Sequence, residues 1–138
     1  MALEGFNAWR IISTSTYEDI TLQFIRNNSG LYNINIIFML VSFNVPFTVP
    51  DVYEVINLQN GSTVPPNCFI LFRREVQSRV SSTGLRIGRG ALSRLLSAIW
   101  NDLRVNDPNL VNSFRNVANN VARMFNERLR IRIVNGFE

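Results

Sequence analysis

Apolar side chains recur three and four residues apart along three stretches of the second half of the chain, which is the spacing of one helix face. The clearest stretch begins near Gly90 and carries Leu92, Leu95, Leu96, Ile99, Trp100 and Leu103. The stretch before it, from the prolines Pro65 and Pro66 to about Val80, carries Phe69, Phe72, Val76 and Val80. The stretch after it, which opens at Asp107-Pro108, carries Leu110, Phe114, Val117, Val121, Phe125 and Leu129. Three amphipathic helices are the fewest that can bury one another's apolar faces, so this half predicts a helical core.

The first 60 residues lack this spacing and are rich in β-branched and aromatic residues, as strands are. Such runs lie at 9–12, 20–25 and 32–43, and Asn27-Asn28-Ser29-Gly30 is a turn signal between two of them. The run Ile36–Phe43 indicates a buried strand, because it is far shorter than the roughly 20 residues of a membrane span. We expect residues 1–60 to form a smaller, strand-containing or mixed segment, divided near Asn60 from a domain over residues 61–134.

The charge is distributed unevenly along the chain. Residues 1–60 hold two Arg against five acids, a net of −3, whereas residues 61–138 hold twelve Arg against five acids, a net of +7. All fourteen basic residues are arginine, whose planar guanidinium suits phosphates and guanine edges, although codon bias would also produce this composition. The second half therefore favours a polyanionic partner.

Few residues in the chain suit catalysis or metal binding. There is no histidine and a single cysteine, Cys68, so the usual general base and the usual zinc ligand sets are missing from the sequence. The glycine-containing stretch 84–90 lacks the Gly-Lys-Ser/Thr ending of a phosphate-binding loop and follows a predicted helix, which indicates a helix connection. We expect no enzyme activity, no metal, no cofactor, no small-molecule ligand and no membrane span.

Three ordered signatures within the predicted helices resemble the HMG box, and in particular its fungal mating-type subfamily. They are Pro65-Pro66-Asn67-Cys68-Phe69-Ile70-Leu71-Phe72-Arg73 in the first helix, Leu92-Ser93-Arg94-Leu95-Leu96-Ser97-Ala98-Ile99-Trp100 in the second, and Phe114 followed by Ala118 in the third. The resemblance covers about half of the chain. It implies a mainly α fold, with a three-helix, L-shaped box at residues 61–134.

The same resemblance implies a function and a set of contacts. The family binds the minor groove of double-stranded DNA and bends it, so the resemblance implies a nuclear transcription regulator of the mating-type kind. Ile70 matches the family's wedge between base steps, and Asn67 and Ser93 match its DNA-contacting residues. Arg73, Arg74, Arg89 and Arg94 would neutralise phosphates if the helices are arranged as in the box.

Each of these residues also has a plainer interpretation. Ile70 lies beside the apolar face of its helix and would otherwise widen the core, Asn67 would cap the helix, and Ser93 would be a solvated position. An arginine alone is most often a solvated surface charge. Thr63-Val64 stands where the family usually has a basic residue, which suits an alternative function: a degenerate box that binds proteins, such as other transcription regulators.

Overall fold

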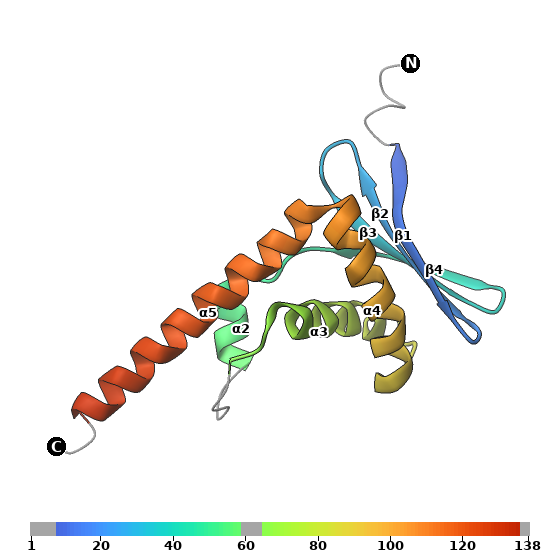
Figure 1. Ribbon diagram of the computed structural model, residues 1–138. Helices are drawn as coiled ribbons and strands as arrows, with labels where there is room; N and C mark the ends of the chain where they lie inside the picture. The colour runs from blue at the N-terminus through green and yellow to red at the C-terminus, as the bar shows by residue number, and fades with distance from the viewer. Residues whose placement is uncertain (1–7, 59–64, 136–138) are drawn as a thin grey trace.

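The described residues form a four-stranded sheet followed by four helices (Figure 1). The computed structural model describes residues 8–58 and 65–135, with side chains for 8–56 and 65–128. The strands are β1 (Trp9–Tyr17), β2 (Ile20–Asn27), β3 (Tyr32–Phe38) and β4 (Val41–Phe47), and the helices are α2 (Val52–Leu58), α3 (Cys68–Ser81), α4 (Arg89–Asn106) and α5 (Pro108–Asn135). The boundary expected near Asn60 lies outside the described residues.

The four strands pair antiparallel with their chain neighbours, in the order β1-β2-β3-β4. Because side chains alternate across a strand, Leu22 and Phe24 of β2 and Ile34 and Ile36 of β3 share one face, and all four are fully buried. The expected turn after β2 is confirmed: the Asn27 side chain accepts the N–H groups of Ser29 and Leu31 at 3.0 and 2.9 Å. One face of the sheet therefore belongs to the core.

The single buried strand expected over Ile36–Phe43 is wrong. Residues Met39 and Leu40 form a tight turn between β3 and β4, and Leu40 is fully exposed. Met39 has a φ of 56°, in the left-handed region that usually selects glycine. The turn carries no glycine, proline or asparagine, so the run looks continuous in the sequence.

The three longer helices lie where the apolar spacing predicts them, with differences at their ends. α3 begins at Cys68, after the prolines, because Asn67 is its N-cap and accepts the Ile70 N–H at 2.9 Å. α5 begins at Pro108, where a missing N–H costs nothing, and continues to Asn135. The short helix α2 was not predicted, and it buries Val55 and Ile56.

The mainly α fold implied by the HMG-box resemblance is wrong, because the chain is an α+β protein. The buried face of the sheet and the apolar faces of the helices form a single hydrophobic cluster. Helices α3 and α4 therefore pack against strands as well as against each other and against α5. Five buried residues of this cluster, Leu22, Phe24, Ile34, Ile36 and Phe47, belong to strands. Without them the helical aromatic residues would face water.

Phe72 lies at the centre of this shared core. Its ring centroid is 5.3 Å from that of Phe24 and 5.9 Å from that of Phe47, both in the sheet. On the helical side the corresponding distances are 4.9 Å to Trp100 and 5.5 Å to Phe114. Aromatic pairs at such distances add to the free energy gained from burial alone. Phe72 thus joins two strands to three helices.

Polar contacts fix β1 along α4. A β-bulge between Ile11 and Ser13 turns Ser13 toward the helix, where its hydroxyl donates to Asp102 at 2.8 Å. Nearby, the Asn106 amide donates to the backbone oxygen of Ile12 at 3.1 Å. The bulge therefore sets which hydroxyls of β1 reach α4.

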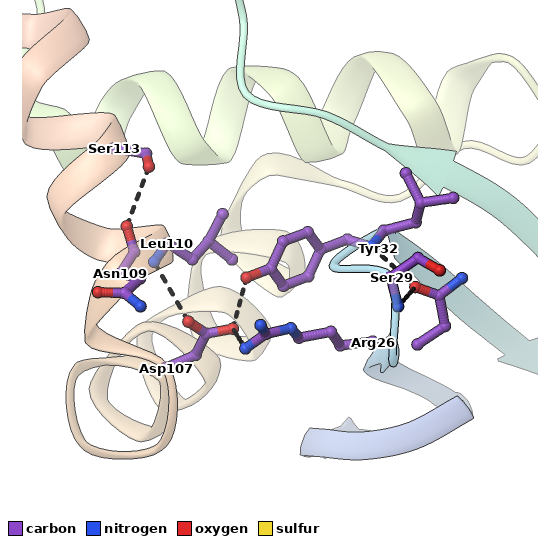
Figure 2. A network of polar contacts seen from close by, with 9 residues as sticks. Arg26, Ser29, Tyr32, Asp107, Asn109, Leu110 and Ser113 are labelled. Atoms are coloured by element: carbon purple, nitrogen blue, oxygen red, sulfur yellow. Dashed lines mark hydrogen bonds and ion pairs between the residues drawn. The ribbon is translucent and has the colours of Figure 1, made fainter. Parts of the chain in front are cut away.

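Asp107 connects the sheet to the point where α4 ends and α5 begins (Figure 2). Its buried carboxylate accepts the Tyr32 hydroxyl at 2.6 Å and the Leu110 N–H at 3.3 Å, and it lies 3.5 Å from the Arg26 guanidinium. A buried carboxylate needs several such partners to offset its lost hydration. This network holds the corner between α4 and α5 against β2 and β3.

We predict that Phe72→Ala lowers the free energy of unfolding by about 3–5 kcal/mol, the usual cost of truncating a buried aromatic residue. Urea denaturation followed by circular dichroism measures the change. Tyr53→Ala on α2 is the control, because Tyr53 is 63% exposed and its loss should change stability by less than about 0.5 kcal/mol. Equal effects of the two substitutions would show that the sheet and the helices do not share a core through Phe72.

We predict that Tyr32→Phe destabilises the protein by about 1–3 kcal/mol, because it removes a hydrogen bond to a buried carboxylate. Burial and the hydrogen bond to Asp107 raise the pKa of Tyr32 above its usual value of about 10. Above a pH of about 10 the unfolded chain releases the Tyr32 hydroxyl proton, whereas the folded chain retains it. The stabilisation from Tyr32 therefore decreases as the pH rises.

The difference in stability between the parent and Tyr32→Phe should therefore be full below about pH 10 and shrink above it. Urea titrations between pH 8 and pH 11 measure it. Ser13→Ala is the matched control, since it removes a sheet-to-helix hydrogen bond that does not involve a tyrosine hydroxyl. A Tyr32→Phe difference that is constant over the range would contradict the expectation.

Candidate nucleic-acid interface

Asn67, Ile70 and Arg74 lie on one face of α3, because they are three and four residues apart. Asn67 and Arg74 are exposed, and Ile70 is half-buried. The Asn67 oxygen caps the helix, which confirms the capping interpretation of this residue. Its amide group retains two N–H donors for a further partner.

Ile70 differs from the other apolar residues of the first helical turns. Leu71 and Phe72 are buried in the core, and Cys68 and Phe69 pack against it, whereas Ile70 does neither. The interpretation in which Ile70 widens the core is therefore not supported. The side chain is placed on the same helix face as Asn67 and Arg74.

A hydrogen bond joins this face of α3 to α4. The Arg73 guanidinium donates to the Ser93 hydroxyl at 3.3 Å. Arg89 lies four residues before Ser93 on α4 and so shares its helix face, where it is exposed. We call the surface formed by Asn67, Ile70, Arg73, Arg74, Arg89 and Ser93 the arginine face.

Arg94 lies beside the arginine face and turns toward the sheet. Its guanidinium carbon is 5.1 Å from the centroid of the Tyr17 ring on β1, the geometry of a cation–π contact. The residue remains exposed. Of the seven residues that the sequence singled out, Asn67, Ile70 and Arg74 share one face of α3, and Arg73 joins that helix to Ser93, one turn after Arg89 on α4. Arg94 contacts the sheet.

The positive charge of the arginine face is not neutralised within the described residues. The described residues form two ion pairs, both outside the arginine face: Arg79 with Glu75, at 3.1 Å, and Arg26 with Asp107. Asp102, another acid of the helical half, accepts the Ser13 hydroxyl. Glu75, Asp102 and Asp107 are therefore engaged elsewhere, and the arginine face can accept an anionic partner.

The corner at Asp107 differs from the arginine face, because its polar groups surround a pocket. A pocket of 220 Å³ lies there, lined by Arg10, Ile11, Ile12, Arg26, Asn106 and Asp107. Its carboxylate already accepts contacts from three groups, so it does not offer a free general base. No group of three or more potential ligand side chains is placed to hold a metal ion in the part of the chain that the structure describes.

Sequence reasoning missed the partners of Asp107. The pair Asp107-Pro108 is a recognisable helix start, but Tyr32 lies 75 residues away and nothing in its local sequence points to the helix. The hydrogen bond between Arg73 and Ser93 was also not predictable, because it depends on how α3 and α4 dock. Helical spacing alone identifies the face of each helix and not its neighbour.

The described helices include none that is both long enough and apolar enough to cross a membrane. Comparisons with models of known protein families, with curated proteins and with solved structures return no match to the chain.

Proposed function

We propose that the chain binds double-stranded DNA through the arginine face of α3 and α4. The observation that carries this proposal is the set of arginines Arg73, Arg74 and Arg89, exposed or half-exposed on two adjoining helices without an ion pair among the described residues. Arginines placed in this way bind phosphates and release the counterions condensed on DNA. This electrostatic contribution requires no particular DNA sequence.

The remaining residues of the arginine face suit contacts inside a groove. Ile70 is an apolar side chain outside the core, between Asn67 and Arg74, and minor-groove proteins insert such side chains between base steps to bend the duplex. The Asn67 amide can donate to the acceptors on the floor of that groove. The corresponding cellular role is that of a transcription regulator in the nucleus, as the resemblance implies.

We predict that Arg73→Ala combined with Arg74→Ala weakens binding to a 25-base-pair duplex and lowers the slope of log affinity against log salt by about 2, one unit for each lost phosphate contact. Fluorescence anisotropy of the full-length chain at several salt concentrations measures both quantities. The whole chain is needed because the sheet contributes Phe24 and Phe47 to the core around Phe72.

Arg79→Ala is the matched control on the same helix. Arg79 is already paired with Glu75 and donates to the Thr48 hydroxyl at 3.1 Å, so its removal should change the salt slope by much less. Circular dichroism verifies that each variant is folded. An unchanged slope in the Arg73/Arg74 variant would show that these arginines do not contact DNA.

We predict that Ile70→Ala leaves the fold intact and reduces the bend of the bound duplex, because an alanine side chain is too short to separate two stacked bases. Fluorescence transfer between dyes at the duplex ends measures the bend. The variant should lose less affinity for a pre-bent duplex than for a linear one.

Val105→Ala is the control, because Val105 on α4 is an apolar side chain that is 80% exposed. A parent-like bend in Ile70→Ala rejects the wedge, and an unfolded variant would place Ile70 in the core.

The outer face of the sheet favours a second candidate function, a protein-interaction module that binds other regulators. This face carries hydroxyls, amides and apolar residues without a charged side chain, and hydrogen bonds link the amides across three strands. Those amides belong to Gln23, Asn33, Asn35 and Asn44. Protein interfaces are depleted of charge at their centre, so this surface suits a protein better than DNA.

A complex that survives the Arg73/Arg74 substitutions and is lost on Asn44→Arg would favour this function.

A further inference from the structure

The solvent-facing side of α5 consists of asparagine and arginine residues. These asparagine and arginine residues are three or four positions apart, so they lie on one face of the helix, and all are exposed. They are Asn112, Arg115, Asn116, Asn119, Arg123 and Asn126. The opposite face of α5 is apolar and buries Leu110, Phe114 and Val121 in the shared core. We call the exposed residues the asparagine stripe.

Helix stability does not explain the asparagine stripe. Asparagine is a weak helix former, because its side chain competes for the backbone hydrogen bonds, and a solvated helix face is usually built from better formers. α5 nevertheless holds seven asparagines, whereas α3 and α4 together hold two, Asn101 and Asn106. The composition of the helices in general therefore does not account for it.

The asparagine stripe also carries two positive charges, and its side chains form no hydrogen bond or ion pair among the described residues. Between Pro108 and Asn126 there is no acidic residue, and the nearest acid before it, Asp107, is buried and bound to Tyr32. Within the described part of the chain, no hydrogen bond or ion pair of these six side chains is found. Glu127 follows the stripe directly and lies four residues after Arg123, but no ion pair between the two is found. The stripe thus presents amide donors and acceptors together with two guanidinium groups that form no ion pair among the described residues.

We propose that the asparagine stripe is a second surface for double-stranded DNA and that it enters the major groove. This inference rests on the proposed DNA-binding function and extends it to a part of the chain outside the arginine face. The major groove is wide enough for a helix, asparagine amides pair with adenine there, and arginine pairs with guanine or with phosphate. From Asn112 to Asn126 the stripe extends over about 21 Å at 1.5 Å per residue, enough to follow the groove over several base pairs.

The projection of α5 makes this stripe accessible. The helix leaves the sheet at its first turns and runs away from it toward the C-terminus (Figure 1). Its contacts with α2, α3 and α4 involve the apolar face, so the stripe points away from the elements that pack on α5. A duplex can therefore approach it without displacing a described element.

The test uses the full-length chain and a fluorescent 30-base-pair duplex of mixed sequence, titrated by anisotropy from 50 to 300 mM NaCl. Arg115→Ala with Arg123→Ala should lower affinity about tenfold and the salt slope by about 2, if each arginine contacts a phosphate or a base. Arg79→Ala, which removes an arginine already paired with Glu75, is the control.

A second variant separates DNA contact from a structural role. Asn116→Ala with Asn119→Ala should raise the melting temperature, because alanine is the better helix former, and should lower DNA affinity about tenfold. A purely structural role for these residues would not move stability and affinity in opposite directions. Unchanged affinity in both α5 variants would overturn the inference.

The outcomes distinguish the two DNA surfaces. If the parent does not bind the duplex, both proposals fail. If only the Arg73/Arg74 variant loses affinity, the arginine face is retained and the α5 surface is rejected. If only the α5 variants lose affinity, the stripe is supported and the arginine face is rejected. Binding of double-stranded RNA as tight as that of DNA would also overturn the inference, because the major groove of RNA is too narrow for a helix.

Discussion

The contact of Phe72 with the sheet is the interaction on which the rest of the structure depends. This one ring touches Phe24 and Phe47 on the strands and Trp100 and Phe114 on the helices. Neither layer could bury its apolar face alone, since a sheet and a set of helices each need a second layer against which to pack. The orientation of α3, and with it the placement of Asn67 to Arg74, follows from this packing.

The same packing determines which helix surfaces remain available to a partner. The sheet covers the side of α4 that carries Asp102 and Asn106, while Ser93 lies on the side that adjoins α3. Glu75, Asp102 and Asp107 are engaged in contacts within the fold. The exposed arginines of α3 and α4 form no ion pair among the described residues and so contribute positive potential. The arrangement therefore separates the charges that hold the protein together from those that can bind DNA.

Local patterns in the sequence predicted much of the secondary structure but not the assembly of the layers. Apolar spacing located α3, α4 and α5, and the Asn27 turn separated β2 from β3. The β3–β4 turn was not predicted, because Met39 and Leu40 are apolar. The helix α2 was not predicted, because it is only seven residues long. The contacts of Phe72 with Phe24 and Phe47 join residues far apart in the sequence, and no local pattern encodes such a contact.

The candidate site was likewise predictable from local spacing but not in the contacts that depend on packing. Helical spacing was enough to place Asn67, Ile70 and Arg74 on one face, but the contact of Arg94 with Tyr17 required the docked sheet. The fold class was misjudged for a related reason. Motifs in the helical half resemble a purely helical family, whereas the buried residues of β2 and β3 make the sheet part of the same core as the helices.

Asp107 has a mechanical consequence, because α4 ends and α5 begins at this one residue and the sheet holds it from the side. No linker lies between the two helices that could act as a hinge, and opening the corner would expose a buried carboxylate. In the proposed complex the protein is therefore the stiff component, and the duplex takes up the deformation. The elastic energy of the duplex, which is lowest at flexible pyrimidine–purine steps, would then contribute to the choice of binding site without any base being touched.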